Sequence, residues 1–177
     1  LMIANWMRVG FVHGVMNTDN MSIHGVTIDY GPYGWIEDYD PTWTPNTTDA
    51  NGRRYRFGQQ AEIGAWNFAR LLESISPLME QPERLYECLE AYYNAYEHFD
   101  QEMWVQKLGL DKFKQEDTVL IQNLLANLQL VETDMTIFFR LLASVKAPNI
   151  EALYDAFYDT NTIPTTEWNQ WLKAWWE

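Results

Sequence analysis

The stretch Asn20–Asp29, N-M-S-I-H-G-V-T-I-D, predicts a β-hairpin around a two-residue turn at His24-Gly25. A Gly at the second turn position suits the positive φ of tight hairpin turns. About this turn the side chains alternate between an apolar and a polar face, as the period of two in a β-strand requires. The apolar face holds Met21, Ile23, Val26 and Ile28, and the polar face holds Asn20, Ser22, Thr27 and Asp29. The sequence therefore predicts a half-buried hairpin.

The open end of this hairpin would hold an amide and a carboxylate side by side. In the predicted register Asn20 faces Asp29, and directly opposed residues have Cβ atoms roughly 5 Å apart. Hard cations such as Mg²⁺ bind such oxygens, usually together with substrate phosphates. We therefore predict that Asn20 and Asp29 are metal ligands. The alternative is that two polar residues simply flank a surface hairpin.

The segment before the hairpin has the spacing of a protein-kinase catalytic loop. Kinases carry H-R-D, four further residues and Asn, with D-F-G further on. Here His13 and Asn20 are seven positions apart, and Asp29-Tyr30-Gly31 stands where D-F-G would. Val15 occupies the position of the kinase catalytic Asp and cannot accept a proton. Asp19 is the only carboxylate inside the loop.

Several motifs near the start of the chain point to one protein family. In order, the sequence carries H-G-V-M-N-T-D-N-M-S-I, T-I-D-Y-G-P, Y-D-P with P-N-T-T-D, G-R-R-Y-R-F-G-Q-Q and W-N-F-A-R-L. Together they resemble the selenoprotein O (SelO/YdiU) family of kinase-fold proteins. The resemblance is dense over about residues 1–75 and looser over the remainder.

This resemblance implies protein adenylylation, in which AMP moves from ATP to Ser, Thr or Tyr hydroxyls of protein substrates. It also implies a cation, Mg²⁺ or Mn²⁺. Asp19 matches the family's proposed catalytic base, while Asn20 and Asp29 match its metal ligands. Asp29 would also lie beside the nucleotide phosphates. The alternative role for Asp19 is a contact to nearby loop backbone, which is common for Asp.

The expected fold is mainly α with a small β-hairpin region, similar to the C-lobe of a protein kinase with the N-lobe absent. Residues 1–58 would hold the catalytic loop, the metal-binding hairpin and an activation-loop-like segment, and residues 59–177 the helical part of the same domain. The sequence has no G-x-G-x-x-G motif and no Lys before Lys107. We therefore expect a fragment that is inactive alone.

Apolar stripes and helix-stop residues predict the helices of the second part. They are expected over about 60–74, 82–108, 115–128, 133–145 with Thr133 as its cap, 150–158, and from 165 to the Trp-rich end. The stripe of the second helix is Leu85, Leu89, Tyr92, Tyr96, Phe99 and Met103.

Composition excludes several classes of protein. The net charge of −13 argues against nucleic acid as a partner, because neutralising phosphates needs a basic face. No apolar run approaches 18 residues, so a membrane partner is not expected. The family resemblance implies a cytoplasmic protein in bacteria and a mitochondrial one in eukaryotes. The single cysteine, Cys88, excludes an internal disulfide and is predicted to be a small buried hydrophobe.

The histidines are expected to have structural or solvated positions. We expect His13 to brace the loop by hydrogen bonds, His24 to be a turn residue and His98 to be solvated.

Two further clusters have alternative interpretations. The basic cluster Arg53, Arg54 and Arg56 would either bind phosphate or substrate or pair with nearby acids. The Trp-rich tail at 168–176 would either face a core or lie exposed against a segment outside this sequence.

Two other functions compete with adenylylation. The first is a kinase-like phosphotransferase, against which Val15 argues because the usual base is missing. The second is a non-catalytic pseudokinase scaffold, whose acidic helical surface would bind a partner.

Overall fold

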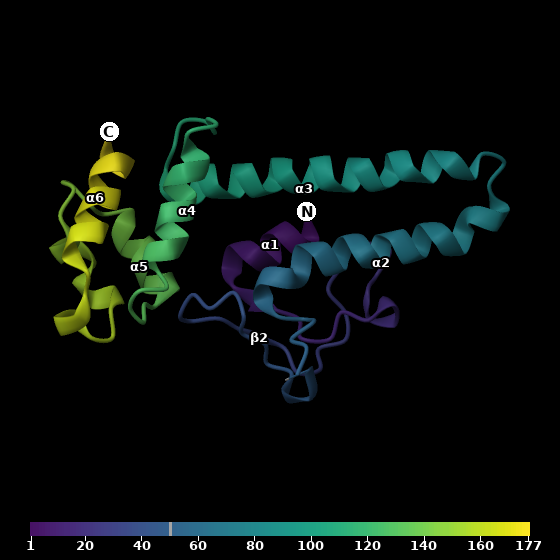
Figure 1. Cartoon of the computed structure of the whole chain (residues 1–177), viewed down its shortest axis with the longest axis horizontal. Helices are drawn as coiled ribbons and strands as arrows, with labels where there is room; N and C mark the ends of the chain where they lie inside the picture. Colours follow the sequence, from purple (N-terminus) through teal and green to yellow (C-terminus); the bar gives the residue numbers. More distant parts are fainter. Residues whose placement is uncertain (50) are drawn as a thin grey trace. The chain divides into compact units, whose positions relative to one another are not determined.

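The computed structural model describes residues 1–49 and 51–177, and it is mainly helical (Figure 1). The α-helices are α1 (Met2–Val9), α2 (Gln60–Ile75), α3 (Leu85–Leu108), α4 (Asp117–Asn127), α5 (Met135–Leu142) and α6 (Thr165–Trp176). The strands β1 (Phe11–Val12) and β2 (Gly34–Trp35) form a small antiparallel sheet. The 3-10 helices are η1 (Thr18–Asn20), η2 (Thr47–Asp49), η3 (Phe57–Gln59), η4 (Ser76–Leu78), η5 (Pro82–Arg84), η6 (Ile150–Ala156) and η7 (Thr160–Thr162). The predicted mainly α class is confirmed.

The chain forms two compact units. Unit 1 comprises Leu1–Ile36 and Pro41–Met103, and unit 2 comprises Glu37–Asp40 and Trp104–Glu177. The division predicted at residue 58 separates functional segments of one domain and not compact units, so it stays a prediction.

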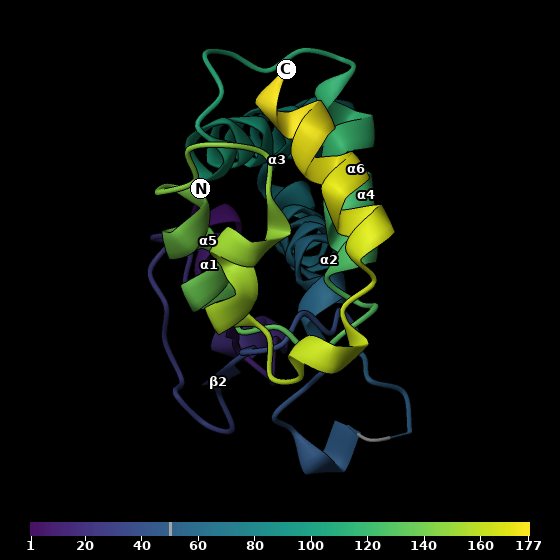
Figure 2. The ribbon, with the colours of Figure 1, turned by 90° about the vertical axis from the view of Figure 1, so that its left-hand side faces the viewer.

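Unit 1 is built on α1, the small sheet and α2. Its buried cluster contains Ile3 and Trp6 of α1, Phe11 of β1, Met16, and Ile63 of α2. Helix α1 ends at Gly10, whose φ of 72° lies in the left-handed region that suits a helix C-terminus. Helix α2 and the first part of α3 run beside each other (Figures 1 and 2), and the Tyr92 hydroxyl of α3 donates to the Ala61 carbonyl of α2 at 2.9 Å.

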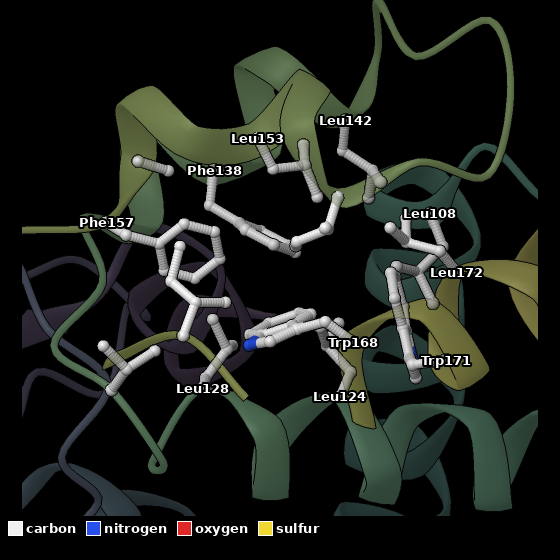
Figure 3. Close-up of a cluster of buried hydrophobic side chains, with 14 of the residues drawn as sticks. Leu108, Leu124, Leu128, Phe138, Leu142, Leu153, Phe157, Trp168, Trp171 and Leu172 are labelled. Atoms are coloured by element: carbon white, nitrogen blue, oxygen red, sulfur yellow. The ribbon is translucent and has the colours of Figure 1, made fainter. Parts of the chain in front are cut away.

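Unit 2 has a larger core, centred on Trp168 of α6, which is fully buried. Its indole lies 5.3 Å from the ring of Phe138 and 5.4 Å from the ring of Phe157, between ring centroids (Figure 3). Helix α6 packs beside α4 (Figures 1 and 2). Trp168 and Trp171 are buried, which confirms the core-facing interpretation for this part of the Trp-rich tail.

The hairpin predicted over Asn20–Asp29 is wrong. Residues 21–30 form no strand, and their turn is closed by the amide of Gly25 donating to the Ser22 carbonyl at 3.1 Å. Three of the four residues of the predicted apolar face are exposed, with Ile23 77% exposed, and only Met21 packs against the core of unit 1. A segment of alternating apolar and polar residues folds as a β-hairpin only where its apolar face can pack against another apolar surface. An isolated two-stranded hairpin is only marginally stable in water. Strand pairing occurs instead between β1 and β2, which flank the segment.

The helix predictions hold best where Pro and Gly mark the ends. Helices α2, α4 and α6 begin and end within about two residues of the expected positions, and α3 begins three residues later than expected, after the 3-10 helix η5. Asp134, and not Thr133, caps α5, because its side chain accepts from the Ile137 amide at 2.8 Å. The helix expected over 150–158 is the 3-10 helix η6.

The prediction for Cys88 is wrong, because this residue is exposed on α3. The predicted stripe of α3 is confirmed as its better-buried side. In this part of α3 only the residues of the stripe are partly buried. Cys88 lies at the edge of the stripe and therefore faces solvent. Among the helices of the described residues, none is both long and apolar enough to span a membrane.

Candidate active site

Polar side chains of α2 form hydrogen bonds with the backbone of the loop His13–Asn20 and of the residues just before it. The amide of His13 donates to Gln60 Oε1 at 3.0 Å, and Gln60 Nε2 donates to the Phe11 carbonyl at 2.9 Å. Two turns further along α2, Asn67 Nδ2 donates to the Met16 carbonyl at 2.9 Å. Gln60 and Asn67 are buried, so these bonds are shielded from water. Helix α2 therefore fixes the position of the loop backbone.

Close packing at Gly14 fixes the other side of the loop. Gly14 has a φ of 80°, and a Cβ placed there would lie 2.4 Å from the Pro32 carbonyl oxygen. The Gly14 carbonyl accepts a hydrogen bond from Asn46 Nδ2 at 3.0 Å. Only glycine fits this backbone, and the loop is thereby packed against both Pro32 and the segment that contains Asn46.

The His13 side chain braces the loop, as predicted. Its ring is 1% exposed, and Nε2 lies 2.8 Å from the Ile28 carbonyl oxygen. A carbonyl only accepts hydrogen bonds, so Nε2 carries the proton and Nδ1 is left as an acceptor. Nδ1 receives the Val15 amide at 3.4 Å. His24 lies in the exposed turn and His98 is exposed on α3, as expected.

The side chain of Asn20 is oriented by the same loop. Asn20 Nδ2 donates to the Val15 carbonyl at 3.1 Å, which fixes the amide plane. Its Oδ1 accepts no hydrogen bond from the described residues, so this oxygen is available to a ligand. Asp19 is exposed in η1, and its carboxylate has no hydrogen-bond or ion-pair partner in the described part of the chain.

Asp29 has an unusual backbone conformation. Its φ of 58° lies in the left-handed region, which Asp tolerates better than most residues. Its carboxylate is exposed and has no partner within residues 1–49 and 51–177. The strand register that predicted Asn20 opposite Asp29 does not exist. Hydrogen bonds connect the two segments instead, from Asn20 to Val15, from Val15 to His13, and from His13 to Ile28, the residue before Asp29.

The donor set fits a hard cation with few protein ligands. Asn20 and Asp29 offer an amide and a carboxylate oxygen, the ligand types that Mg²⁺ accepts. The described residues contain no cluster of three or more His, Cys, Asp or Glu side chains that could hold a metal. A cation here would therefore need phosphate oxygens or water to complete its coordination.

A hollow of about 520 Å³ lies beside the loop. It is lined by Val15, Asn17, Pro32, Asn46, Thr47, Thr48, Asp49 and Tyr55. The Tyr55 hydroxyl donates to Asn17 Oδ1, which joins the segment around Tyr55 to the loop.

Sequence reasoning missed the side chains that support this site, which are Asn46, Tyr55, Gln60 and Asn67. Only the pair on α2 gave a signal. Gln60 and Asn67 are seven positions apart, which places two polar residues on the same face of a helix whose other inward residues are apolar.

Comparisons with known proteins agree with these motifs. The family model described as "Protein adenylyltransferase SelO" matches residues 1–177. A protein nucleotidyltransferase YdiU from Aromatoleum aromaticum is 53% identical over 177 residues, covering 98% of this chain and 34% of the relative. The protein of the same name from Flavobacterium johnsoniae is 50% identical over 181 residues, covering 98% and 35%. The one from Rhodopirellula baltica is 48% identical over 187 residues, covering 98% and 34%. The chain thus spans about a third of the length of these relatives.

Proposed function

Because the chain belongs to the SelO family, whose relatives are protein nucleotidyltransferases, we propose that it forms part of an enzyme that transfers AMP from ATP to protein hydroxyl groups. The acceptors would be Ser, Thr or Tyr side chains, and the fold would be that of a kinase-like C-lobe. The observation that carries this proposal is the family match over the whole chain. The braced loop with its unpartnered oxygens gives it a physical basis.

Asn20 and Asp29 are the proposed metal ligands. The bond from Asn20 Nδ2 to the Val15 carbonyl leaves Oδ1 facing away from that carbonyl, so the loop itself orients the ligand. The backbone of Asp29 has a left-handed conformation, and the carbonyl of the preceding residue, Ile28, accepts a hydrogen bond from His13. Together these features fix the position of the Asp29 backbone, from which the carboxylate extends. A bound Mg²⁺ or Mn²⁺ would neutralise part of the charge on the ATP phosphates.

Asp19 is the proposed base. Its carboxylate would accept the proton of the attacking hydroxyl while that oxygen bonds to the α-phosphorus and pyrophosphate leaves. Val15 has no group that can do this, although it stands at the kinase position. A positioned base contributes roughly 10²–10⁴-fold, so its loss lowers the rate without removing every other contribution.

The test is labelling with ATP that carries the tag on either the α or the γ phosphate, using the complete protein that contains this sequence. Transfer of the α tag alone is expected. Asp19→Asn and Asp29→Ala should each lower this transfer by about 100-fold or more. Asp111→Asn, at an exposed residue of unit 2, is the matched control and should leave it unchanged.

The other two functions predict different results. Transfer of the γ tag alone would establish a kinase-like phosphotransferase. A protein that transfers neither tag, and whose partner-dependent phenotypes survive Asp29→Ala, would be a scaffold.

A further inference from the structure

The basic cluster formed by Arg53, Arg54 and Arg56 carries charge that the described residues do not neutralise. None of the three makes an ion pair within residues 1–49 and 51–177. This is unexpected in a chain with 25 acidic and 12 basic residues, where acids are plentiful. Of the two interpretations of the cluster, pairing with nearby acids is therefore wrong.

The arginines are nevertheless held in place. Arg53 Nη1 donates to Thr42 Oγ1 at 2.9 Å, and Arg56 Nη2 donates to Gln59 Oε1 at 3.0 Å. The Arg54 guanidinium lies over the Trp66 ring, with its Cζ 4.6 Å from the ring centroid. Stacking covers one face of a guanidinium and leaves the N–H groups at its edge free for a carboxylate. An oriented side chain loses less conformational entropy when it binds a ligand.

The cluster is connected to the candidate active site through Tyr55. Tyr55, between Arg54 and Arg56 in the chain, donates its hydroxyl to Asn17 of the catalytic loop. Tyr55 and Asn17 both line the hollow of about 520 Å³, and Asn17 is two residues before Asp19. A polypeptide bound in this hollow would therefore lie against Tyr55, whose neighbours in the chain are Arg54 and Arg56, and against Asn17, two residues before the proposed base.

The lining of the hollow suits a polypeptide better than a nucleotide. It consists largely of amide and hydroxyl groups from Asn17, Asn46, Thr47 and Thr48, which match the donors and acceptors of an extended backbone.

We propose that the arginine cluster selects protein substrates that carry Asp or Glu beside the acceptor hydroxyl. This inference rests on the proposed function and names the substrate class of that site. The rest of the chain is strongly acidic and repels acidic segments at long range. The arginines supply the local attraction for an acidic segment that extends beyond the hollow past Tyr55.

The test is a binding assay with two fluorescent peptides that share a central Tyr. One has Glu on both sides of it, and the other has Gln at the same positions. The complete protein should bind the Glu peptide more tightly, and Arg54→Glu should weaken that binding by about tenfold, while binding of the Gln peptide changes less than about twofold. Salt at about 0.5 M should reduce the preference. Arg140→Glu, at an exposed residue of α5 in unit 2, is the matched charge reversal and should have no effect.

Equal affinity of the unmodified protein for the two peptides would overturn the proposal, as would equal weakening of both peptides by Arg54→Glu. A higher ATP concentration requirement in Arg54→Glu with unchanged peptide preference would assign the cluster to the nucleotide and also overturn it. The binding assay needs no turnover, so absence of AMP transfer would count against the proposed function alone.

Discussion

The Nε2 atom of His13 lies 2.8 Å from the carbonyl oxygen of Ile28, and this contact joins the loop His13–Asn20 to the segment that carries Asp29. The ring is almost fully buried, so it has no water to replace a lost partner. The same ring accepts a hydrogen bond from the Val15 amide, and the Val15 carbonyl accepts one from the Asn20 side chain. One side chain therefore holds together the two segments from which the proposed metal ligands come.

Replacing His13 should destabilise the protein. His13→Ala leaves the Ile28 carbonyl without its donor and opens a cavity where the buried ring was, so we expect a loss of about 2–3 kcal/mol in the free energy of unfolding. The measurement is urea unfolding at neutral pH. His98→Ala, at an exposed site on α3, is the control and should change stability by less than about 0.5 kcal/mol. Equal effects of the two substitutions would contradict a bracing role.

A comparison of two glycines with similar φ angles can distinguish the cost of backbone strain from the cost of a steric clash. Gly14 and Gly25 have φ values of 80° and 66°, but only Gly14 has a neighbour, the Pro32 carbonyl oxygen, within reach of an added Cβ. Gly25→Ala should cost about 1 kcal/mol, from the left-handed backbone alone. Gly14→Ala should cost more, about 3 kcal/mol, because the loop must also move away from Pro32. Thermal unfolding of both variants tests this, and similar melting temperatures would show that the contact yields easily.

The sequence predicted the helices well because each carries its own signal. Helix α2 begins at Gln60 and ends near Pro77, and α3 runs from just after Pro82 to just before Gly109. These limits depend on residues within or beside the helix. The amphipathic stripe of α3 likewise depends on local spacing only.

The hairpin and the loop contacts depend on residues far away in the sequence. Alternation over Asn20–Asp29 suggested a ribbon, yet whether a ribbon forms depends on a surface to cover it, which the segment itself does not encode. The bond from the His13 amide to Gln60 joins residues 47 positions apart. The bracing role of His13 was predicted correctly, while its partners could be found only in the structure.

Trp168 should dominate the stability of unit 2. It is fully buried against Phe138 and Phe157, and its Nε1 has no hydrogen-bond partner among the described residues. Trp168→Ala should cost about 3–5 kcal/mol. Trp168→Phe should cost less than half as much, since it retains aromatic contact and removes the unpaired donor. Trp176→Ala, at a residue 47% exposed, is the control for loss of a Trp from α6. Guanidinium unfolding followed by circular dichroism would measure all three, and equal losses for Trp168→Phe and Trp168→Ala would contradict the packing argument.

Unit 1 should lose stability at high pH because of Tyr92. Burial, with the nearby Tyr93 and Glu62, raises the pKa of Tyr92 to about 12. In the unfolded chain the pKa of a Tyr is about 10. The stabilisation is thus complete below pH 10 and is lost as the pH rises towards 12, because the unfolded state releases its proton first. Tyr92→Phe removes this contribution, so its unfolding free energy should fall less steeply over this interval.

The control for this pH dependence is Tyr86→Phe, since Tyr86 is 80% exposed. That variant should follow the unmodified protein at every pH. Tyr96 stays in all variants, and burial raises its pKa as well, so part of the decline should remain in Tyr92→Phe. Identical slopes for Tyr92→Phe and the unmodified protein would show that the Tyr92 hydroxyl titrates normally.

Asn20 offers a direct way to separate a metal ligand from a loop brace. Asn20→Asp keeps an oxygen for the cation but loses the Nδ2 donor to Val15, whereas Asn20→Ala loses both. If the oxygen binds the cation, Asn20→Asp should retain part of the Mg²⁺- or Mn²⁺-dependent AMP transfer, and Asn20→Ala should raise the half-saturating cation concentration by about tenfold or more. If only the bond to Val15 matters, the two variants should be equally impaired at every cation concentration. Cation titrations of α-labelled AMP transfer in the complete protein distinguish these results, with Asn123→Ala on the exposed side of α4 as the control.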